Sequence, residues 1–374
     1  MNILILNWRD IKNPEGGGAE IILYELAKRL VEEKNSVTWF CSSYKNSLKE
    51  EVTKGIKIIR SGGKYSVFFH AFQYYRGLKV KPDIVLDCIN TVCWQTSLYV
   101  DQKKRILYAN QAARRAFFYE YPFPFSLLAY IIEPLQYLTY KKTRTICYSN
   151  SIKEDLISFG IKRENIEIFP LGIDHSRYFP KRKANQPTFI YVARFVRNKR
   201  PERCVAAMTV VVPKYPEAKL YLIGYGKEER NLKAQIKKLK LTKNVFIVNK
   251  NNFFLKNDVR DEKIRLMQEA WALLLPSVKE GWGMVVTEAA ACGTPSIVSN
   301  VTGLRDSVIH NKTGIILSSN PSPTEMAKAM INLIENKRRE EFYKNSIAWS
   351  KNFSWSKSFD AFYKYILRRK VDGK

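Results

Sequence analysis

The chain has 374 residues, of which 63 are lysine or arginine and 35 are aspartate or glutamate, so its formal net charge is +28. Hydrophobic residues make up 45% and aromatic residues 13%, which excludes a disordered basic tail and indicates a chain that buries apolar surface. At about 100–200 residues per domain, the length predicts two domains. The basic excess is typical of proteins that meet nucleic acid, an acidic membrane or a phosphorylated substrate, although it also serves solubility alone.

The cysteines and histidines predict no metal site. The six cysteines occur singly, without a CxxC pair, and only three histidines are present. We therefore expect neither a zinc site nor a histidine-based metal site, and reduced thiols typical of a cytoplasmic protein. The N-terminus lacks the features of a signal peptide. The longest apolar stretch, residues 117–140, is interrupted by Glu120, Glu133 and three prolines, so we do not expect it to span a bilayer.

Short apolar runs alternate with helical patterns in the first half of the chain. Residues 3–6 and 36–41 are predicted strands on either side of an amphipathic helix over 19–33. Further strands are predicted at 84–87, 105–109 and 145–149. The alternation favours parallel βαβ units in a doubly wound sheet.

A stretch rich in turn-forming and basic residues, 169–186, predicts an interdomain linker. A second α/β alternation follows it. The predicted strands are 188–193, 219–223, 245–248, 272–276 and 296–299, and the predicted helices are 201–211, 228–239, 261–270, one that includes 287–291, and 355–369. Two Rossmann-like halves of about 170 residues each fit the usual size of a domain.

Three consecutive glycines, Gly16, Gly17 and Gly18, lie between the first strand and the first helix. Backbone NH groups in such a loop can approach an anion at a helix N-terminus, so the loop is a candidate acceptor or phosphate loop. A glycine turn that only packs the helix on the strand is the equal alternative. The GxGxxG spacing of a dinucleotide site is absent, and no carboxylate ends the second strand, which disfavours NAD.

The segment 277–300 places Glu280 and Glu288 eight positions apart, with Gly281 and Gly283 between them. If a strand ends near residue 276 and a helix starts after Gly283, Glu280 lies in the loop and Glu288 on the first turns of the helix. Two carboxylates repel phosphate, so we interpret them as acceptors for sugar and ribose hydroxyls. The alternative, a solvated helix face, is weakened by the glycines and by the apolar residues around them.

Groups that favour an anion lie near these carboxylates. The free NH groups of Gly283, Met284 and Val285 would face a pyrophosphate. Arg194 and Lys199 follow the first strand of the second half, and the next strand ends at Gly224, which we include among the donor-binding residues. Ligands of open α/β sheets bind at the carboxyl ends of strands, where two cations could neutralise a diphosphate leaving group. Taken alone, two basic side chains in a loop are usually only exposed to solvent and bind no ligand.

Together these motifs resemble the retaining glycosyltransferases of family 4. The resemblance rests on the E-x7-E block with AxxxGTP, the Arg194 and Lys199 pair, the glycine loop with Ala19-Glu20, and Gly172-Ile173-Asp174. It implies the GT-B fold, in which two facing Rossmann-like doubly wound parallel-sheet domains enclose an interdomain cleft. The implied acceptor-binding domain covers 1–170, the nucleotide-sugar-binding domain covers 171–352, and a final helix, 353–370, crosses back to the first.

The resemblance also implies roles for the residues. The chain would move a sugar from a nucleotide-sugar, without metal or cofactor, to a glycan, glycolipid or lipid-linked acceptor. Arg194 and Lys199 would hold the donor diphosphate, Glu280 the sugar hydroxyls and Glu288 the ribose, so we expect Arg194→Ala or Glu288→Ala to abolish transfer and leave the fold intact.

Many family members carry a histidine in the first-domain loop where this chain has Asn110 and Gln111. Neither residue acts as a general base near neutral pH. A retaining mechanism tolerates the change, because the departing phosphate oxygen can accept the acceptor's proton. The substitution therefore bears on recognition of the donor sugar more than on the chemistry.

Residues 117–140 are aromatic and flanked by basic residues. They either dock on an anionic membrane or hold a lipid-linked acceptor, or they form a buried helical hairpin, and the sequence leaves these alternatives equal. We expect a cytoplasmic protein. If residues 117–140 dock on a membrane, we expect peripheral attachment to the inner face of the cell membrane. The alternative functions are a GT-B-type nucleotide-sugar epimerase and a basic nucleic-acid-binding protein. No nucleic-acid-binding motif is present, so nucleic acid is not an expected partner.

Overall fold

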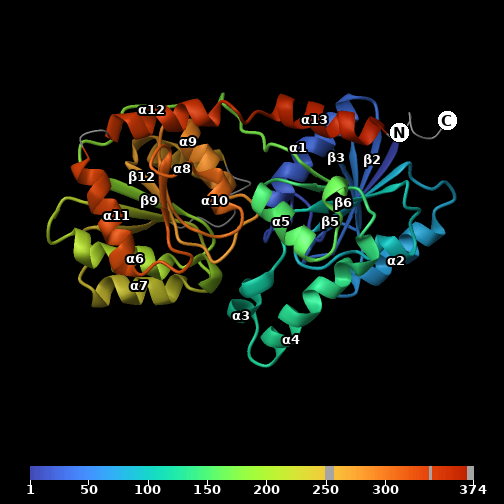
Figure 1. The fold of residues 1–374 in the computed structure, drawn as a ribbon, viewed down its shortest axis with the longest axis horizontal. Helices are drawn as coiled ribbons and strands as arrows, with labels where there is room; N and C mark the ends of the chain where they lie inside the picture. The colour runs from blue at the N-terminus through green and yellow to red at the C-terminus, as the bar shows by residue number, and fades with distance from the viewer. Residues whose placement is uncertain (249–256, 337–338, 369–374) are drawn as a thin grey trace. The chain divides into compact units, whose positions relative to one another are not determined.

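The computed structural model describes residues 1–248, 257–336 and 339–368, and the chain divides into two compact units (Figure 1). The first unit contains Met1–Arg114, Leu127–Gly172 and the segment that begins at Trp355. The second contains Arg115–Ser126 and Ile173–Ser354.

The first unit is built on an eight-stranded sheet with the order β3-β4-β2-β1-β5-β6-β7-β8. Only the edge pair of β3 and β4 is antiparallel. The strands are β1 (Asn2–Leu6), β2 (Ser36–Cys41), β3 (Glu50–Thr53), β4 (Ile56–Arg60), β5 (Ile84–Ile89), β6 (Arg105–Ala109), β7 (Thr145–Cys147) and β8 (Ile166–Ile168). The helices are α1 (Gly18–Glu32), α2 (Val67–Gly77), α5 (Asn150–Ser158) and α13 (Trp355–Leu367), and between β6 and β7 the chain forms α3 (Phe117–Glu120) and α4 (Phe125–Ile132). Short 3-10 turns complete it: η1 (Thr96–Leu98), η2 (Arg114–Ala116), η3 (Glu133–Tyr140) and η4 (Arg163–Asn165).

The central strands of this sheet are mostly apolar because helices cover both of their faces, and β5 also buries one carboxylate, Asp87. Leu4 and Leu6 of β1 join Phe40 of β2 in one core, and Val67 and Ala71 of α2 pack against them. This core holds α2 beside β5 and the residues that follow β5.

The second unit is built on a six-stranded parallel sheet with the order β11-β10-β9-β12-β13-β14. The strands are β9 (Thr188–Val192), β10 (Lys219–Ile223), β11 (Val245–Val248), β12 (Ala272–Leu275), β13 (Ser296–Ser299) and β14 (Gly314–Leu317). Helices α6 (Pro201–Val211), α7 (Glu229–Lys238) and α11 (Pro323–Glu335) lie on one face, and α8 (Asn257–Glu269), α9 (Met284–Ala291) and α12 (Arg339–Ser350) lie on the other (Figure 1). The turn η5 (Arg197–Lys199) follows β9, and α10 (Leu304–Ser307) follows β13.

Each sheet has one point where the strand order reverses. In the first unit the chain moves outward from β1 to β2 and β4 and then returns to β5 on the other side of β1. In the second unit it moves from β9 to β10 and β11 and returns to β12. Open α/β sheets bind ligands outside the carboxyl ends of the strands at such switch points. The residues that follow β9 and β12 are therefore candidates for a ligand site.

The predicted fold class, two doubly wound parallel-sheet α/β domains, is confirmed. The bounds of β2, β6, β10, β11, β13 and α6 are those predicted. Helix α9 begins at Met284, directly after Gly283, as the interpretation of the segment with Glu280 and Glu288 required. The sequence did not predict β3, β4, β8, β14, α2, α5 or the helices α10 to α12.

One segment lies in a different unit from the one predicted for it. Residues 115–126 fall in the predicted first domain, but they pack in the second unit. The reason is a pair of hydrogen bonds to distant parts of the sequence: the Tyr119 hydroxyl accepts from Arg200 at 2.8 Å, and Glu120 Oε1 accepts from Asn198 at 3.0 Å. The structural division after Gly172 lies two residues beyond the predicted boundary.

Helix α13 belongs to the first unit, where its first residue packs on a glycine. A Cβ atom on Gly172 would lie 2.2 Å from the Trp355 ring, so no other residue type fits there without displacing the helix. Phe362 of α13 is buried against Tyr108 and Phe169.

Helix α4 and η3 expose much of their apolar surface. The side chains of Phe123 and Phe125 are 77% and 63% exposed, and those of Leu128 and Ile131 are 53% and 58% exposed. A buried hairpin is therefore wrong for α4, although Tyr137 and Tyr140 of η3 are buried. Among the residues that the structure describes, no helix combines the length and the apolar character needed to cross a membrane.

Candidate active site

At the switch point of the second unit, the loops after β9 and β12 are bonded to each other. The Val278 NH donates to the Asn198 carbonyl at 2.9 Å. Lys199 Nζ donates to Glu280 Oε1 at 2.5 Å, and the Ser277 hydroxyl donates to the same oxygen at 2.8 Å. The Lys199 and Glu280 side chains are only 14% and 16% exposed. The structure thus brings together the predicted cation and the predicted sugar-binding carboxylate.

The buried side chain of Tyr191 holds the loop that carries the two predicted cations. Its hydroxyl lies 3.2 Å from the Arg194 carbonyl and 3.4 Å from the Lys199 carbonyl, so its single proton can bond to either. Arg194 itself is exposed at the carboxyl end of β9. Tyr191 therefore fixes both ends of this turn and leaves the Arg194 side chain available to solvent.

Glu288, one turn into α9, is held by a buried lysine. Lys263 Nζ donates to Glu288 Oε2 at 2.5 Å and to the Tyr178 hydroxyl at 3.0 Å, and the two ion-paired side chains are 7% and 13% exposed. Burial lowers the pKa of Lys263, but the Glu288 charge and the phenol outweigh it and raise the pKa, so Lys263 stays protonated. Burial, assisted by the charge of Glu288, raises the pKa of Tyr178 to about 12.

Sequence reasoning missed Lys263 and Tyr178. A signal for Lys263 was present, because it shares one helical face with Met267 and Ala270, at positions i, i+4 and i+7, and both of these are fully buried. A lysine in an otherwise apolar stripe needs an acidic partner. Tyr178 lies in the irregular linker, where no periodicity could have identified it.

Glycines close the loop between the two glutamates. Gly283 has a left-handed backbone (φ +86°), and a Cβ there would lie 2.6 Å from Leu304. A Cβ on Gly303 would lie 2.6 Å from the Gly281 carbonyl. Helix α9 starts directly after Gly283, and its first NH groups, including those of Met284 and Val285, have no partner within the helix. Partial positive charge therefore points into the loop that holds Glu280.

Gly224 lies at the end of β10, where the backbones of neighbouring strands approach closely. A Cβ on Gly224 would lie 2.1 Å from the Ala193 carbonyl oxygen. The NH of Phe195 donates to the carbonyl of Tyr225 at 2.8 Å, which joins the exits of β9 and β10. Gly224 thus shapes the edge from which Arg194 projects, and its contact with a donor stays a prediction.

In the first unit, the glycine loop meets a carboxylate of the chain itself. The Gly17 NH donates to Glu20 Oε2 at 2.6 Å, and Asn7 Nδ2 donates to Glu20 Oε1 at 3.2 Å. Gly16 closes a turn onto Asn13, and Gly18 is the first residue of α1. Glu20 is buried and already accepts the backbone NH of Gly17, which was predicted to bind an anion. A phosphate at this loop would therefore be repelled by the negative charge of Glu20. The arrangement suits a hydroxyl-bearing acceptor better than a phosphate.

Asparagines follow three adjacent strands of the first sheet. Asn7 follows β1, Asn90 follows β5 and donates to Asn7 Oδ1 at 3.3 Å, and Asn110 follows β6. Asn110 is buried, and its Oδ1 accepts from the Tyr148 hydroxyl at 2.7 Å. Within the described residues, its Nδ2 is buried without a hydrogen-bond partner. Gln111, the neighbouring candidate, is half-exposed. Since the amides of Asn7 and Asn90 donate to protein oxygens, Asn110 is the candidate donor to a ligand hydroxyl at this edge.

Comparison with known proteins identifies both halves of the chain. The Glycosyltransferase Family 4 model matches residues 16–177, and the Glycosyl transferases group 1 model matches residues 174–349. An uncharacterized glycosyltransferase of Methanocaldococcus jannaschii is 28% identical over 59% of this chain and 58% of its own length. The match thus spans less than two thirds of that curated relative.

Solved structures share the architecture over the whole chain. Sucrose-phosphate synthase from Thermosynechococcus elongatus has a TM-score of 0.79 at 19% identity, with all of both chains covered. HepE of Anabaena, solved with UDP-glucose, has a TM-score of 0.72 at 17% identity, with 98% of this chain and 100% of that chain covered. At these identities the likeness shows the GT-B fold.

The buried pair of Lys263 and Glu288 gives a stability prediction. Lys263→Met leaves the Glu288 carboxylate buried without its counter-charge, and we expect the free energy of unfolding to fall by about 3–5 kcal/mol. Urea denaturation measures the change. The same pair bears on Glu288→Ala: this change leaves Lys263 buried without its counter-charge, so we expect that variant to lose stability as well as activity.

The matched control lies two residues along the same helix. Arg265 pairs with Glu269 on the surface, where the side chains are 54% and 38% exposed. Arg265→Met should change stability by less than about 1 kcal/mol. Equal effects of the two substitutions would show that the Lys263 pair is not the buried anchor described above.

Proposed function

Because the chain belongs to the glycosyltransferases of family 4, we propose that it transfers a hexose from a nucleotide-sugar to a glycan, glycolipid or lipid-linked acceptor at a membrane surface. The transfer retains the anomeric configuration and needs no metal or other cofactor. The observation that carries the proposal is the bonded pair of Lys199 and Glu280 at the switch point of the second sheet, beside the N-terminus of α9.

The second unit would bind the donor. Arg194, Lys199 and the first NH groups of α9 supply positive charge for a diphosphate, which is the charge that a divalent cation supplies in other enzymes. A diphosphate would draw Lys199 toward itself and leave Glu280 to accept hydrogen bonds from the sugar hydroxyls. Lys263 fixes the orientation of Glu288, so that the carboxylate can receive the ribose hydroxyls. The UDP-glucose bound to HepE supports a donor of this class.

The reaction would follow from this charge distribution. The bond between the anomeric carbon and the phosphate oxygen breaks, and a bond to the acceptor oxygen forms on the same face of the sugar. The acceptor's proton passes to the departing phosphate oxygen, so no protein base is needed. Negative charge develops on the diphosphate, where Arg194 and Lys199 stabilise it. Asn110 can orient a hydroxyl through its amide but cannot take a proton.

The first unit would bind the acceptor at the membrane. Exposed apolar side chains of α4 and η3 form a surface that we call the α4 face: Leu128, Ile131, Ile132, Leu135 and Leu138. Clusters of this kind mark interaction sites. The exposed lysines Lys141 and Lys142 follow η3 and favour anionic headgroups. These features support peripheral binding to the cytoplasmic leaflet.

Arg194 gives the most direct test of the donor site. Arg194→Ala should lower kcat/KM for transfer by about 100-fold or more, because a cation at the leaving group is lost. The fold should survive, since the side chain is exposed. Release of nucleoside diphosphate from a panel of UDP-, GDP- and ADP-sugars measures the activity.

The control is Arg197→Ala in the same turn. Arg197 is 76% exposed and its guanidinium lies 3.4 Å from Glu228, so its removal should leave transfer within about threefold of the wild type by the weakness of surface pairs. Full activity of the Arg194 variant would exclude the donor-site assignment.

The α4 face predicts salt-sensitive membrane binding. The wild-type protein should sediment with vesicles that contain phosphatidylglycerol, and high salt should release part of it. The double change Leu128→Glu with Ile131→Glu should lower the bound fraction at least tenfold. Leu48→Glu, at a residue of the same unit that is 65% exposed, is the control and should have no effect. Vesicle binding that survives the double change would rule out docking through α4.

A further inference from the structure

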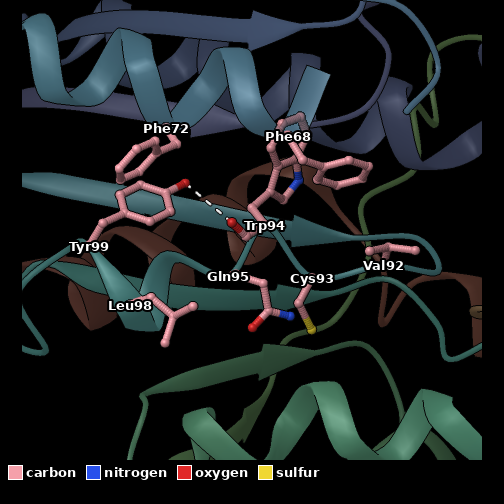
Figure 2. Close-up of a pocket in the computed structure, with 8 residues that line it drawn as sticks. All are labelled: Phe68, Phe72, Val92, Cys93, Trp94, Gln95, Leu98 and Tyr99. Atoms are coloured by element: carbon pink, nitrogen blue, oxygen red, sulfur yellow. Dashed lines mark hydrogen bonds between the residues drawn. The ribbon is translucent and has the colours of Figure 1, made fainter. Parts of the chain in front are cut away.

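An apolar pocket lies in the first unit between α2 and the residues that follow β5 (Figure 2). Its cavity volume is about 440 Å³. Phe68 and Phe72 reach into it from one face of α2, one turn apart, and contact the rings of Trp94 and Tyr99 at centroid distances of 4.8 and 5.3 Å. The Tyr99 hydroxyl is turned toward the Trp94 carbonyl, to which it donates at 3.3 Å. The wall of the pocket therefore consists mainly of carbon atoms of aromatic rings.

The mouth of the pocket is apolar as well. Val92 and Leu98 line it and are 49% and 72% exposed. Gln95, between them, has a left-handed backbone with φ +54°, which costs free energy for a residue with a side chain. Aliphatic side chains at the rim of an aromatic pocket favour a hydrocarbon ligand over a polar one.

The pocket is joined to the α4 face by direct bonds between η1 and η3. The Ser97 hydroxyl donates to Thr139 Oγ1 at 2.7 Å, and the Cys93 NH donates to Gln136 Oε1 at 2.7 Å. On η3, Leu135 is 56% exposed. The residues of the pocket mouth and the proposed membrane-binding surface are therefore parts of one connected structure.

Positive charge lies near the amino ends of β6 and β7, beside the residues that follow η1. Gln102 Nε2 donates to the Lys142 carbonyl at 3.1 Å, which places the turn after η1 beside the end of η3. Lys103, Lys141 and Lys142 are exposed here, and Asp101 is the one acidic residue in the sequence from 91 to 105. An anionic headgroup is complementary to this charge.

We propose that this pocket binds the hydrocarbon chain of an anionic, phosphate-bearing lipid. The inference rests on the pocket and on the lysines beside it, and it is independent of the proposed sugar transfer. Leu98 and Tyr99 of the pocket are followed directly by the turn that carries Lys103, at the amino end of β6. A lipid chain in the pocket would place its phosphate beside Lys103, Lys141 and Lys142.

Calorimetric titration of the full chain with octyl, decyl and dodecyl phosphate, each below its critical micelle concentration and without donor, tests the proposal. Affinity should rise about fourfold for each methylene that enters the pocket, the equivalent of about 0.8 kcal/mol. Inorganic phosphate should bind at least 100-fold more weakly than dodecyl phosphate. Leu98→Glu should weaken dodecyl phosphate at least tenfold, and Leu48→Glu, at a similarly exposed position outside the pocket, should not. Val92→Glu is the second variant, should Leu98→Glu fail to fold.

Affinity that does not depend on chain length would overturn the proposal. So would unchanged binding in both rim variants together with weakened binding in Leu128→Glu, because the chain would then lie on the α4 face. A dimer that Leu98→Glu dissociates, with no alkyl phosphate bound, would make a second copy of the chain the occupant. Absence of sugar transfer with chain binding intact would count against the proposed function and leave the pocket standing.

Discussion

Two carboxylates beside a proposed diphosphate site need cations that balance their charge, and two lysines of the second unit meet this requirement. Glu280 is bonded to Lys199 and Glu288 to Lys263, both at 2.5 Å. The formal charges of these four side chains therefore sum to zero. Arg194 and the NH groups that begin α9 then give the site a positive excess, which a diphosphate requires. Without these two lysines, the E-x7-E segment would repel the ligand that it is proposed to bind.

The geometry that keeps these pairs in place comes from the sheet. Because β9 and β12 are neighbours, the loops that follow them meet at one edge, and the Val278 NH bonds the two loops together. Tyr191 anchors the turn after β9, and Gly303 lets the turn after β13 pack on the carbonyls of Glu280 and Gly281. Contacts this close leave little freedom for the backbone. The carboxylates are consequently oriented before a ligand arrives, which lowers the entropic cost of binding.

The parallel strands and the two carboxylates of the candidate site could be predicted from the sequence, for physical reasons. Strands covered on both faces are continuous apolar runs, and β2, β6 and β10 have the predicted bounds because polar residues flank them. The loop with Glu280 was recognisable from its glycines. The helical pattern places Lys263 on a buried face, but it could not identify Glu288 as the partner, because Glu288 lies 25 residues away and helix patterns show only local neighbours. The packing of residues 115–126 with the second unit also depends on non-local bonds, those of Tyr119 and Glu120, which no periodicity encodes. The exposure of the α4 face depends on which elements pack against it. The same apolar sequence pattern occurs in a buried core and at a membrane surface, so the sequence could not distinguish the two.

The central claim is that the second unit binds a nucleoside diphosphate between Arg194, Lys199 and the start of α9. Thermal unfolding with UDP, GDP and ADP, without any sugar or acceptor, tests it most directly. One nucleotide should raise the unfolding temperature of the wild-type protein in a concentration-dependent way, by an amount that corresponds to about 2.7 kcal/mol at 100 times its Kd. The shift should be lost in Arg194→Ala. Identical unfolding temperatures with and without all three nucleotides at millimolar concentration would contradict the account.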